Sequence, residues 1–208
     1  MTLLRDVRSP GWNATSDGSP VVLFLHGYGS DEHDLASLAP ALGLGDRWAS
    51  LRGPLDMPGG GAAWGPITTP GEPDRAIVEA ATAAIWSWAD DNTESGSTVV
   101  PIGFSQGGVM ASQLLRTHPE RVAATVILGG FVLGDDQPAD DAIAASRPPV
   151  FWGRGAQDRV IAPHAIERTT AWLPGHSTLT ERVYPDLAHG IHAAELADVR
   201  AFLDAHGA

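Results

Sequence analysis

Residues 98–115 read TVVPIGFSQGGVMASQLL, and this stretch indicates how the chain folds. Its first part, 98–102, is a short and mostly β-branched apolar run, typical of a strand that is covered on both faces. In 109–115 the apolar side chains recur at helical spacing. Between them, 103–107 (GFSQG) matches the pattern G-x-S-x-G, in which a serine occupies a tight turn from a strand into a helix. The stretch therefore predicts a strand, a strained turn that carries Ser105, and a helix.

The turn around Ser105 makes specific demands on its neighbours. Glycines at 103 and 107 have no β-carbon, so the strand and the helix can approach closely. The helix N-terminus then directs free N–H groups toward negative charge that develops beside the serine. The pattern alone is weak in a chain with 24 glycines, since a glycine-rich turn can carry an incidental serine. The strand before it and the helix after it favour a nucleophile over that alternative.

The rest of the chain alternates apolar runs with amphipathic segments. Further strands are predicted at 21–25, 48–52, 122–128, 150–152 and 179–184. Further helices are predicted after Ser30, Asp74 and Pro163, over about 140–145, and around 196–203. Strands and helices that alternate over short links form β–α–β units, so we expect an α/β fold, a mostly parallel twisted sheet flanked by helices. We find no internal repeat and no long linker, and we expect a single domain over 1–208.

The composition excludes several classes of protein. With 43% hydrophobic residues, the chain is not intrinsically disordered. The 25 acidic and 13 basic residues give a net charge of −12, which repels phosphate and anionic headgroups, so we expect no nucleic-acid partner. The apolar runs are too short for stable membrane insertion, and 1–13 has no apolar core of a secretory signal. We therefore expect a cytoplasmic protein. Without cysteine there is no disulfide or thiolate site.

A serine nucleophile needs a base, and the base needs a carboxylate that holds its tautomer. In a fold of this kind the acid and then the histidine follow on loops after later strands. Asp158, after the strand near 150–152, and His189, after the strand 179–184, stand at those places. The alternatives are His192 for the base, and Asp186, Asp135 and Asp136 for the acid. We favour His192 as a structural residue that begins the last helix.

The oxyanion that forms when a serine attacks a carbonyl group is held by two backbone N–H groups. One should belong to Gln106, the residue after the nucleophile, and the other to the loop after the first strand, where we select Tyr28. We interpret His26, in the same loop, as structural. His189 and His192 form no metal site, because a third ligand is not evident. No metal and no cofactor is expected.

Four motifs together resemble the phospholipase/carboxylesterase family of α/β-hydrolases, which includes acyl-protein thioesterases. They are His26-Gly27-Tyr28-Gly29, Gly103-Phe104-Ser105-Gln106-Gly107-Gly108, Gly155-Ala156-Gln157-Asp158 and Tyr184-Pro185-Asp186-Leu187-Ala188-His189. The likeness covers about 18–206. It implies an α/β-hydrolase fold without a large cap domain, which cleaves esters or thioesters through Ser105, His189 and Asp158. Family members often dimerise, so the resemblance also implies a homodimer.

The segment 53–73 contains six glycines and five prolines, too broken for a regular element, and loops of this length are usually functional. It departs from the family, because Trp64 is followed by glycine and proline where the family has an aromatic residue and an acid. This departure argues against long-chain lipid or lipoprotein substrates. The expected apolar substrate pocket is formed by Trp64, Met57, Ile67, Phe131 and Leu133. The alternative for Trp64 is that it only packs the loop onto the body.

The combined expectation is a serine esterase whose small-molecule partners are small to medium, uncharged or weakly polar carboxylic esters, or thioesters. Two alternatives stay open from the residues. The same three side chains serve lactonases and hydrolases of carbon–carbon or peptide bonds, because the fold does not fix the scissile bond. The second alternative is that the chain is a catalytically silent member of the fold and acts as a binding protein. The presence of all three reactive side chains and both oxyanion loops argues against the silent alternative.

Overall fold

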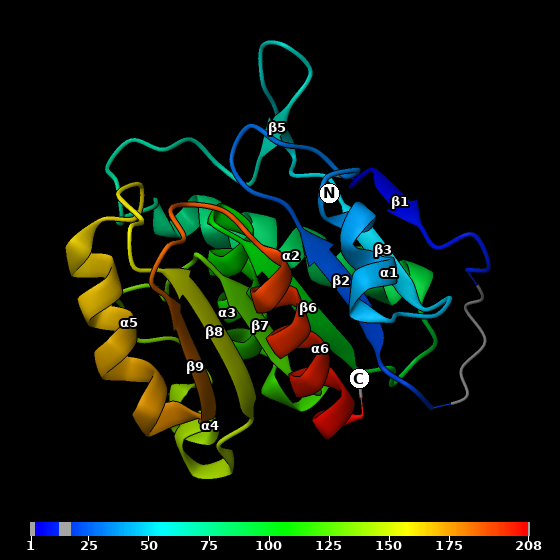
Figure 1. Ribbon diagram of the computed structural model, residues 1–208. Coiled ribbons are helices and arrows are strands. Elements are labelled where there is room, and N and C mark those ends of the chain that lie inside the picture. The colour runs from blue at the N-terminus through cyan, green and yellow to red at the C-terminus, as the bar shows by residue number, and fades with distance from the viewer. Residues whose placement is uncertain (1–2, 13–17, 208) are drawn as a thin grey trace.

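The computed structural model describes residues 3–12 and 18–207 (Figure 1). Its centre is a seven-stranded sheet in the order β1-β3-β2-β6-β7-β8-β9. The edge strand β1 runs antiparallel to β3, and the other neighbouring pairs are parallel. The strands are β1 (Asp6–Arg8), β2 (Val21–Leu25), β3 (Trp48–Leu51), β6 (Val99–Phe104), β7 (Thr125–Leu128), β8 (Pro149–Gly155) and β9 (Thr178–Tyr184). This is the mostly parallel sheet that the alternating sequence predicts.

Helices cover both faces of the sheet. Figure 1 shows α1 and α6 on the near face and α2 and α3 on the far face. Leu23 and Leu25 of β2 pack into the core under α2 to α5, whereas Val22 and Phe24 pack into the core under α1 and α6. The helices are α1 (Ala39–Leu42), α2 (Arg75–Asn92), α3 (Gln106–Thr117), α4 (Asp140–Ser146), α5 (Pro163–His176) and α6 (Ala193–His206). Burial on both faces explains why these strands are continuously apolar.

The register brings the carboxyl ends of the parallel strands to one edge. Leu25 of β2 pairs with Gly103 of β6, and Phe104 pairs with Leu128 of β7. At the other side, Gly155 of β8 pairs with Tyr184 of β9. The loops that follow these strands therefore meet over a single edge, where ligands bind in open α/β sheets. Among the described residues no large cap domain covers this edge.

The segment after β2 differs from the prediction of one helix that starts at Ser30. The Ser30 hydroxyl donates to Asp34 at 2.7 Å, and a short 3₁₀ helix (Leu35–Leu38) leads into the four-residue α1. Gly43 ends α1 in the left-handed conformation at φ 71°. Because the hydroxyl bonds to a side chain and not to a backbone N–H, it does not cap a helix here.

Three short strands were not expected from the sequence. β1 precedes the first predicted strand, and a small antiparallel hairpin of β4 (Leu55–Asp56) and β5 (Ala62–Ala63) lies within 53–73. The hairpin projects above the sheet in Figure 1. Arg52 holds it, since its guanidinium donates to Asp56 at 3.0 Å and to the Gly60 carbonyl at 2.8 Å. The segment is therefore ordered by hydrogen bonds from a buried arginine and not by apolar periodicity.

The stretch 1–13, predicted to lack a secretory signal, is described only over 3–12, so residues 1, 2 and 13 lie outside the described structure. None of the helices in the described chain combines the length and the apolar character that crossing a bilayer needs.

Candidate active site

Ser105 lies between the end of β6 and the first residue of α3. Its backbone has φ 54° and ψ −115°, a conformation that residues with a β-carbon rarely adopt. The amide of Ser105 donates to the Leu128 carbonyl at 2.8 Å, which ties the turn to β7. The surrounding sheet therefore maintains the strained turn, and the turn directs the Ser105 side chain out over the edge of the sheet.

The glycines on either side of Ser105 are required by close contact. A β-carbon at Gly103 would lie 2.0 Å from the carbonyl oxygen of Gly107, and one at Gly107 would lie 1.8 Å from that of Leu25. No side chain fits at either distance. The start of α3 thus sits directly on the ends of β6 and β2, which is the reason for the small residues in the motif.

Three side chains from three loops converge beside this turn. His189 Nε2 lies 2.9 Å from the Ser105 hydroxyl, and His189 Nδ1 lies 2.7 Å from Asp158 Oδ2. The Asp158 side chain is only 3% exposed, and its Oδ1 accepts from the amides of Val160 and Ile161 at 2.8 and 3.2 Å. This arrangement allows a hydroxyl proton to pass to an imidazole whose other nitrogen is held by a carboxylate.

The other candidates for the base and the acid are engaged or exposed elsewhere. His192 is the N-cap of α6, where its Nδ1 accepts from the Glu195 amide at 3.2 Å. Its ring packs edge-on against Tyr184 at 4.7 Å. The exposed Asp135 lies 4.0 Å from Arg75, and Asp136 and Asp186 are also exposed. His192 is thus the helix-starting residue that the sequence favoured.

The sequence predicts that the amides of Tyr28 and Gln106 hold an oxyanion; Tyr28 lies in the loop after β2, and Gln106 follows Ser105 as the first residue of α3. Neither N–H donates to an acceptor within 3–12 or 18–207. Gly27 lies against the Phe104 ring, where a β-carbon would be 3.1 Å from it, so the loop with Tyr28 borders the end of β6. N–H groups without such an acceptor are available to a developing oxyanion, and the assignment of these two amides stays a prediction.

His26 is a buried part of this same loop. Its Nε2 accepts from the Gly53 amide at 2.9 Å, and its Nδ1 donates to the Gly27 carbonyl at 2.7 Å. Burial lowers the pKa of His26 below its usual value, because the charged ring loses its hydration. The neutral ring joins the loops around 27 and 53, in agreement with a structural role.

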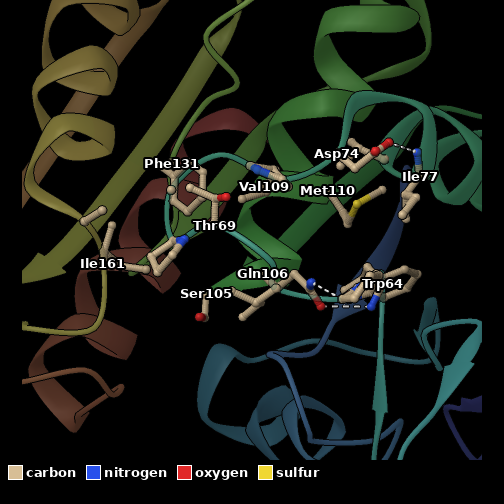
Figure 2. Close-up of a pocket in the computed structure, with 18 of the residues that line it drawn as sticks. Trp64, Thr69, Asp74, Ile77, Ser105, Gln106, Val109, Met110, Phe131 and Ile161 are labelled. Carbon is tan, nitrogen blue, oxygen red and sulfur yellow. Dashed lines mark hydrogen bonds between the residues drawn. The ribbon is translucent and has the colours of Figure 1, made fainter.

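An apolar cavity of about 250 Å³ opens beside Ser105 (Figure 2). Its walls come from the loop 64–71, the first turns of α2 and α3, Phe131 and the loop 160–162. Ser105 and Asp74 lie at opposite corners of it in Figure 2. Of the described residues that line it, Asp74 alone is ionisable. The cavity therefore offers apolar contact next to the hydroxyl and a carboxylate far from it.

The structure distributes the predicted pocket residues over three places. Trp64, Ile67 and Phe131 line the cavity. Met57 does not, because it belongs to the turn of the hairpin, where its amide donates to the Gly61 carbonyl at 2.8 Å. Leu133 does not either, because its side chain is buried in the core beneath the helices. The prediction that Met57 and Leu133 line the substrate pocket therefore does not agree with the lining of this cavity.

Two polar side chains that shape the cavity were missed from the sequence. Gln106 Oε1 accepts from the Trp64 amide at 2.9 Å, and its Nε2 donates to the Gly65 carbonyl at 2.8 Å. Arg168 donates to the carbonyls of Gly71 and Val132 at 2.9 and 2.8 Å. Both side chains hold the loop 64–71 by its backbone. No sequence motif signals them, because their partners are main-chain atoms about 40 and 97 residues away.

One group of side chains in the described chain has the spacing of metal ligands. Ligand atoms of Asp31, Glu32 and His33 lie within 4.8 Å of one another. Glu32, however, accepts from Arg52 at 2.9 Å, so one of the three is already paired. The group lies apart from the cavity-lining residues and adds nothing to the chemistry at Ser105.

A family model described as Phospholipase/Carboxylesterase matches residues 12–207. The chain is also similar to a pimeloyl-[acyl-carrier protein] methyl ester esterase of Neisseria meningitidis serogroup A, with 27% identity over 201 residues. This match covers 90% of the chain but only 58% of that relative's own length.

Solved structures of esterases share the fold. The carboxylesterase of Bacillus cereus superimposes with a TM-score of 0.80 at 19% identity, covering 98% of this chain and 94% of that one. The esterase PE8 superimposes with a TM-score of 0.74 at 23% identity, covering 98% of both chains. The arrangement of sheet and helices is thus common to all three.

Proposed function

The chain belongs to the phospholipase/carboxylesterase family of hydrolases, and from this premise we propose that it is a serine esterase with Ser105 as nucleophile. His189 accepts the hydroxyl proton as Ser105 attacks the ester carbonyl, and Asp158 keeps the imidazole in the accepting tautomer. The observation that carries the proposal is the pair of short contacts, 2.9 Å from Ser105 to His189 and 2.7 Å from His189 to Asp158.

The reaction proceeds through an acyl-enzyme. Attack of Ser105 Oγ on the carbonyl forms an oxyanion, which the amides of Tyr28 and Gln106 stabilise. His189 then returns its proton to the departing alcohol as the carbon–oxygen bond breaks. A water molecule gives a proton to His189 and attacks the acyl-enzyme. As the bond between the acyl carbon and Ser105 Oγ breaks, His189 passes that proton to Oγ, which restores the Ser105 hydroxyl and releases the carboxylic acid.

The cavity supports small to medium, uncharged acyl or alcohol groups as substrates. Its volume of about 250 Å³ is just below the common range for ligand pockets, roughly 300–1,000 Å³. No arginine or histidine lines it among the described residues, so a carboxylate inside it would lack a partner. The Neisseria relative is named for a carrier-bound methyl ester, and the proposal for this chain does not include that substrate. The shared feature is cleavage of an ester bond.

A direct test uses nitrophenyl esters of short and medium chain length with the wild-type protein and Ser105→Ala. We expect a burst of nitrophenol from the wild type and a loss of turnover in the variant. An organophosphonate should add to a single peptide that contains Ser105, as seen by mass spectrometry. Wild-type turnover by Ser105→Ala would exclude the proposal. Thioesters, lactones and amides in the same assay define which bond is preferred.

A further inference from the structure

We propose that Trp64 is a positioning residue of the oxyanion hole, because it joins the two loops that carry the Tyr28 and Gln106 amides. The inference rests on the proposed function, since it needs those two amides to hold an oxyanion. It assigns Trp64 a role beyond lining the acyl cavity. The role uses the two N–H groups of the residue, not the surface of its ring.

Each N–H group of Trp64 reaches one of the two loops. The backbone amide donates to Gln106 Oε1 at 2.9 Å, and the indole Nε1 donates to the His26 carbonyl at 2.9 Å. Gln106 carries one of the proposed oxyanion donors, and His26 stands two residues before Tyr28, which carries the other. In Figure 2 the dashed lines show the side chain of Gln106 bound to the backbone at Trp64. One residue thus connects both halves of the hole.

The partners of Trp64 are themselves held in place. Gln106 makes a second bond to the Gly65 carbonyl at 2.8 Å, which fixes the orientation of its amide. His26 is held by Gly53 at 2.9 Å and by Gly27 at 2.7 Å, and its ring lies 5.5 Å from the Trp64 ring. Trp64 is 2% exposed, and a buried carbonyl without its donor is costly. The connection is therefore rigid.

A rigid connection matters because oxyanion donors act only when they are aimed in advance. Their benefit comes from N–H groups that need no reorganisation as charge develops, and small misplacements reduce the rate severely. Filling the cavity wall requires an aromatic ring at 64 but no indole N–H. The hydrogen bond from the indole N–H to the His26 carbonyl therefore distinguishes the positioning role of Trp64 from its role in lining the cavity.

The test compares Trp64→Phe with Trp86→Phe in hydrolysis of one medium-chain nitrophenyl ester. Trp86 of α2 is a matched control, since it is 5% exposed and donates from Nε1 to Thr117 at the end of α3 at 3.2 Å. Neither residue lines the cavity. We expect Trp64→Phe to lower kcat about tenfold with KM nearly unchanged. Trp86→Phe should leave both constants as they are. A raised KM at unchanged kcat in Trp64→Phe would overturn the proposal.

A second measurement compares two inhibitors of equal chain length. A trifluoromethyl ketone forms an oxyanion when Ser105 adds to it, whereas an alkyl alcohol only fills the cavity. Trp64→Phe should weaken the ketone about tenfold and the alcohol little. Equal weakening of both inhibitors would show that Trp64 serves only as the wall.

If Trp64→Phe does not fold, Gln106→Met breaks the connection from the other end. This variant keeps the backbone N–H of residue 106 and removes the side-chain bonds to Trp64 and Gly65. It should also lower kcat at nearly constant KM, and unchanged kcat would overturn the proposal. A wild-type protein that cleaves no ester would instead contradict the proposed function itself, so the two failures are distinguishable.

Discussion

Asp158 holds His189 with one carboxylate oxygen while the other is bound to the backbone of its own loop. Oδ2 lies 2.7 Å from His189 Nδ1, and Oδ1 accepts from the amides of Val160 and Ile161 at 2.8 and 3.2 Å. The loop therefore aims the carboxylate at the imidazole before any substrate arrives. Because two of the contacts need only an oxygen acceptor, an amide in place of the carboxylate can keep the loop but not the role toward His189.

Asp158→Asn should lower kcat by about 10³–10⁴ with little change in melting temperature. The asparagine oxygen can still accept from the amides of residues 160 and 161, but its NH₂ group faces Nδ1 and donates to it. His189 would then carry its proton on Nε2, where it cannot accept the proton of Ser105. Ester turnover and thermal unfolding of the same sample check this. Asp186→Asn, an exposed acid nearby, is the control. Retained activity in Asp158→Asn would refute the assignment.

Ser105→Gly should be more stable than Ser105→Ala by about 1 kcal/mol, although both are inactive. Both variants lose the bond to His189, but only glycine relieves the strain at φ 54° that a β-carbon imposes. Urea unfolding gives the difference. The same pair of substitutions at Ser87, inside α2, should show the opposite order, since glycine destabilises a helix interior. Equal stability of the two Ser105 variants would mean that the turn carries no strain.

The parts of the fold that were predicted from the sequence are those that depend on burial. Strands such as 21–25 are apolar at every position because both faces are covered, and that pattern is visible without coordinates. The strained serine turn was visible as well, because the close approach at Gly103 and Gly107 leaves glycine as the only residue that fits. These features leave a mark on the residues themselves.

Features that depend on one side chain bonded to backbone groups elsewhere in the chain could not be recognised from the sequence. The hairpin β4–β5 depends on Arg52, and the cavity wall depends on the Gln106 amide, whose partners are the backbone groups of Trp64 and Gly65. Main-chain N–H and C=O groups are chemically the same at nearly every position, so no residue type identifies the ones that form these bonds. For the same reason the sequence suggested Met57 for the pocket, since it could not show that the hairpin directs that segment away.

Asp74→Asn should change which substrates the cavity prefers, according to the charged group at the end of their acyl chain. The Asp74 carboxylate is the one ionisable group among the described lining residues, so it should favour an ester whose acyl chain ends in an ammonium over one that ends in a carboxylate. We expect the ratio of their kcat/KM values to fall about tenfold in the variant, and to fall in the wild type as salt is added. The uncharged ester of equal length should be unaffected.

Asparagine is a suitable replacement here because it preserves the helix start. Asp74 is the N-cap of α2, where Oδ1 accepts from the Ile77 amide at 3.1 Å, and asparagine caps helices equally well. Asp141→Asn, an exposed acid in the first turn of α4, serves as the control for the loss of one charge. If Asp74→Asn and Asp141→Asn shift the ratio equally, the selection comes from the net charge of the molecule and not from the cavity.

Glu195→Gln should stabilise the protein in alkaline solution and have little effect in acid. Glu195 is fully buried in the first turn of α6, and within the part of the chain that the structure describes neither carboxyl oxygen has a hydrogen-bond partner. Burial, with the negative charge of Asp198 adding to it, raises the pKa of Glu195 from 4.5 to about 7. Gly153 leaves the space for this carboxyl group, since a β-carbon there would lie 2.2 Å from Oε1.

The sign follows from where the proton is held. Between pH 4.5 and about 7, the folded protein keeps a proton that the unfolded chain has released, so the free energy of unfolding falls as the pH rises. Above that range the full penalty remains, and it amounts to about 3 kcal/mol. Glutamine carries no charge at any pH, so Glu195→Gln should gain up to this amount near pH 8 and almost nothing near pH 4.5. Urea unfolding across this range, with the exposed Glu167→Gln as a flat reference, measures the difference. A stabilisation that is the same at both ends would mean that Glu195 ionises as freely in the folded protein as in the unfolded chain.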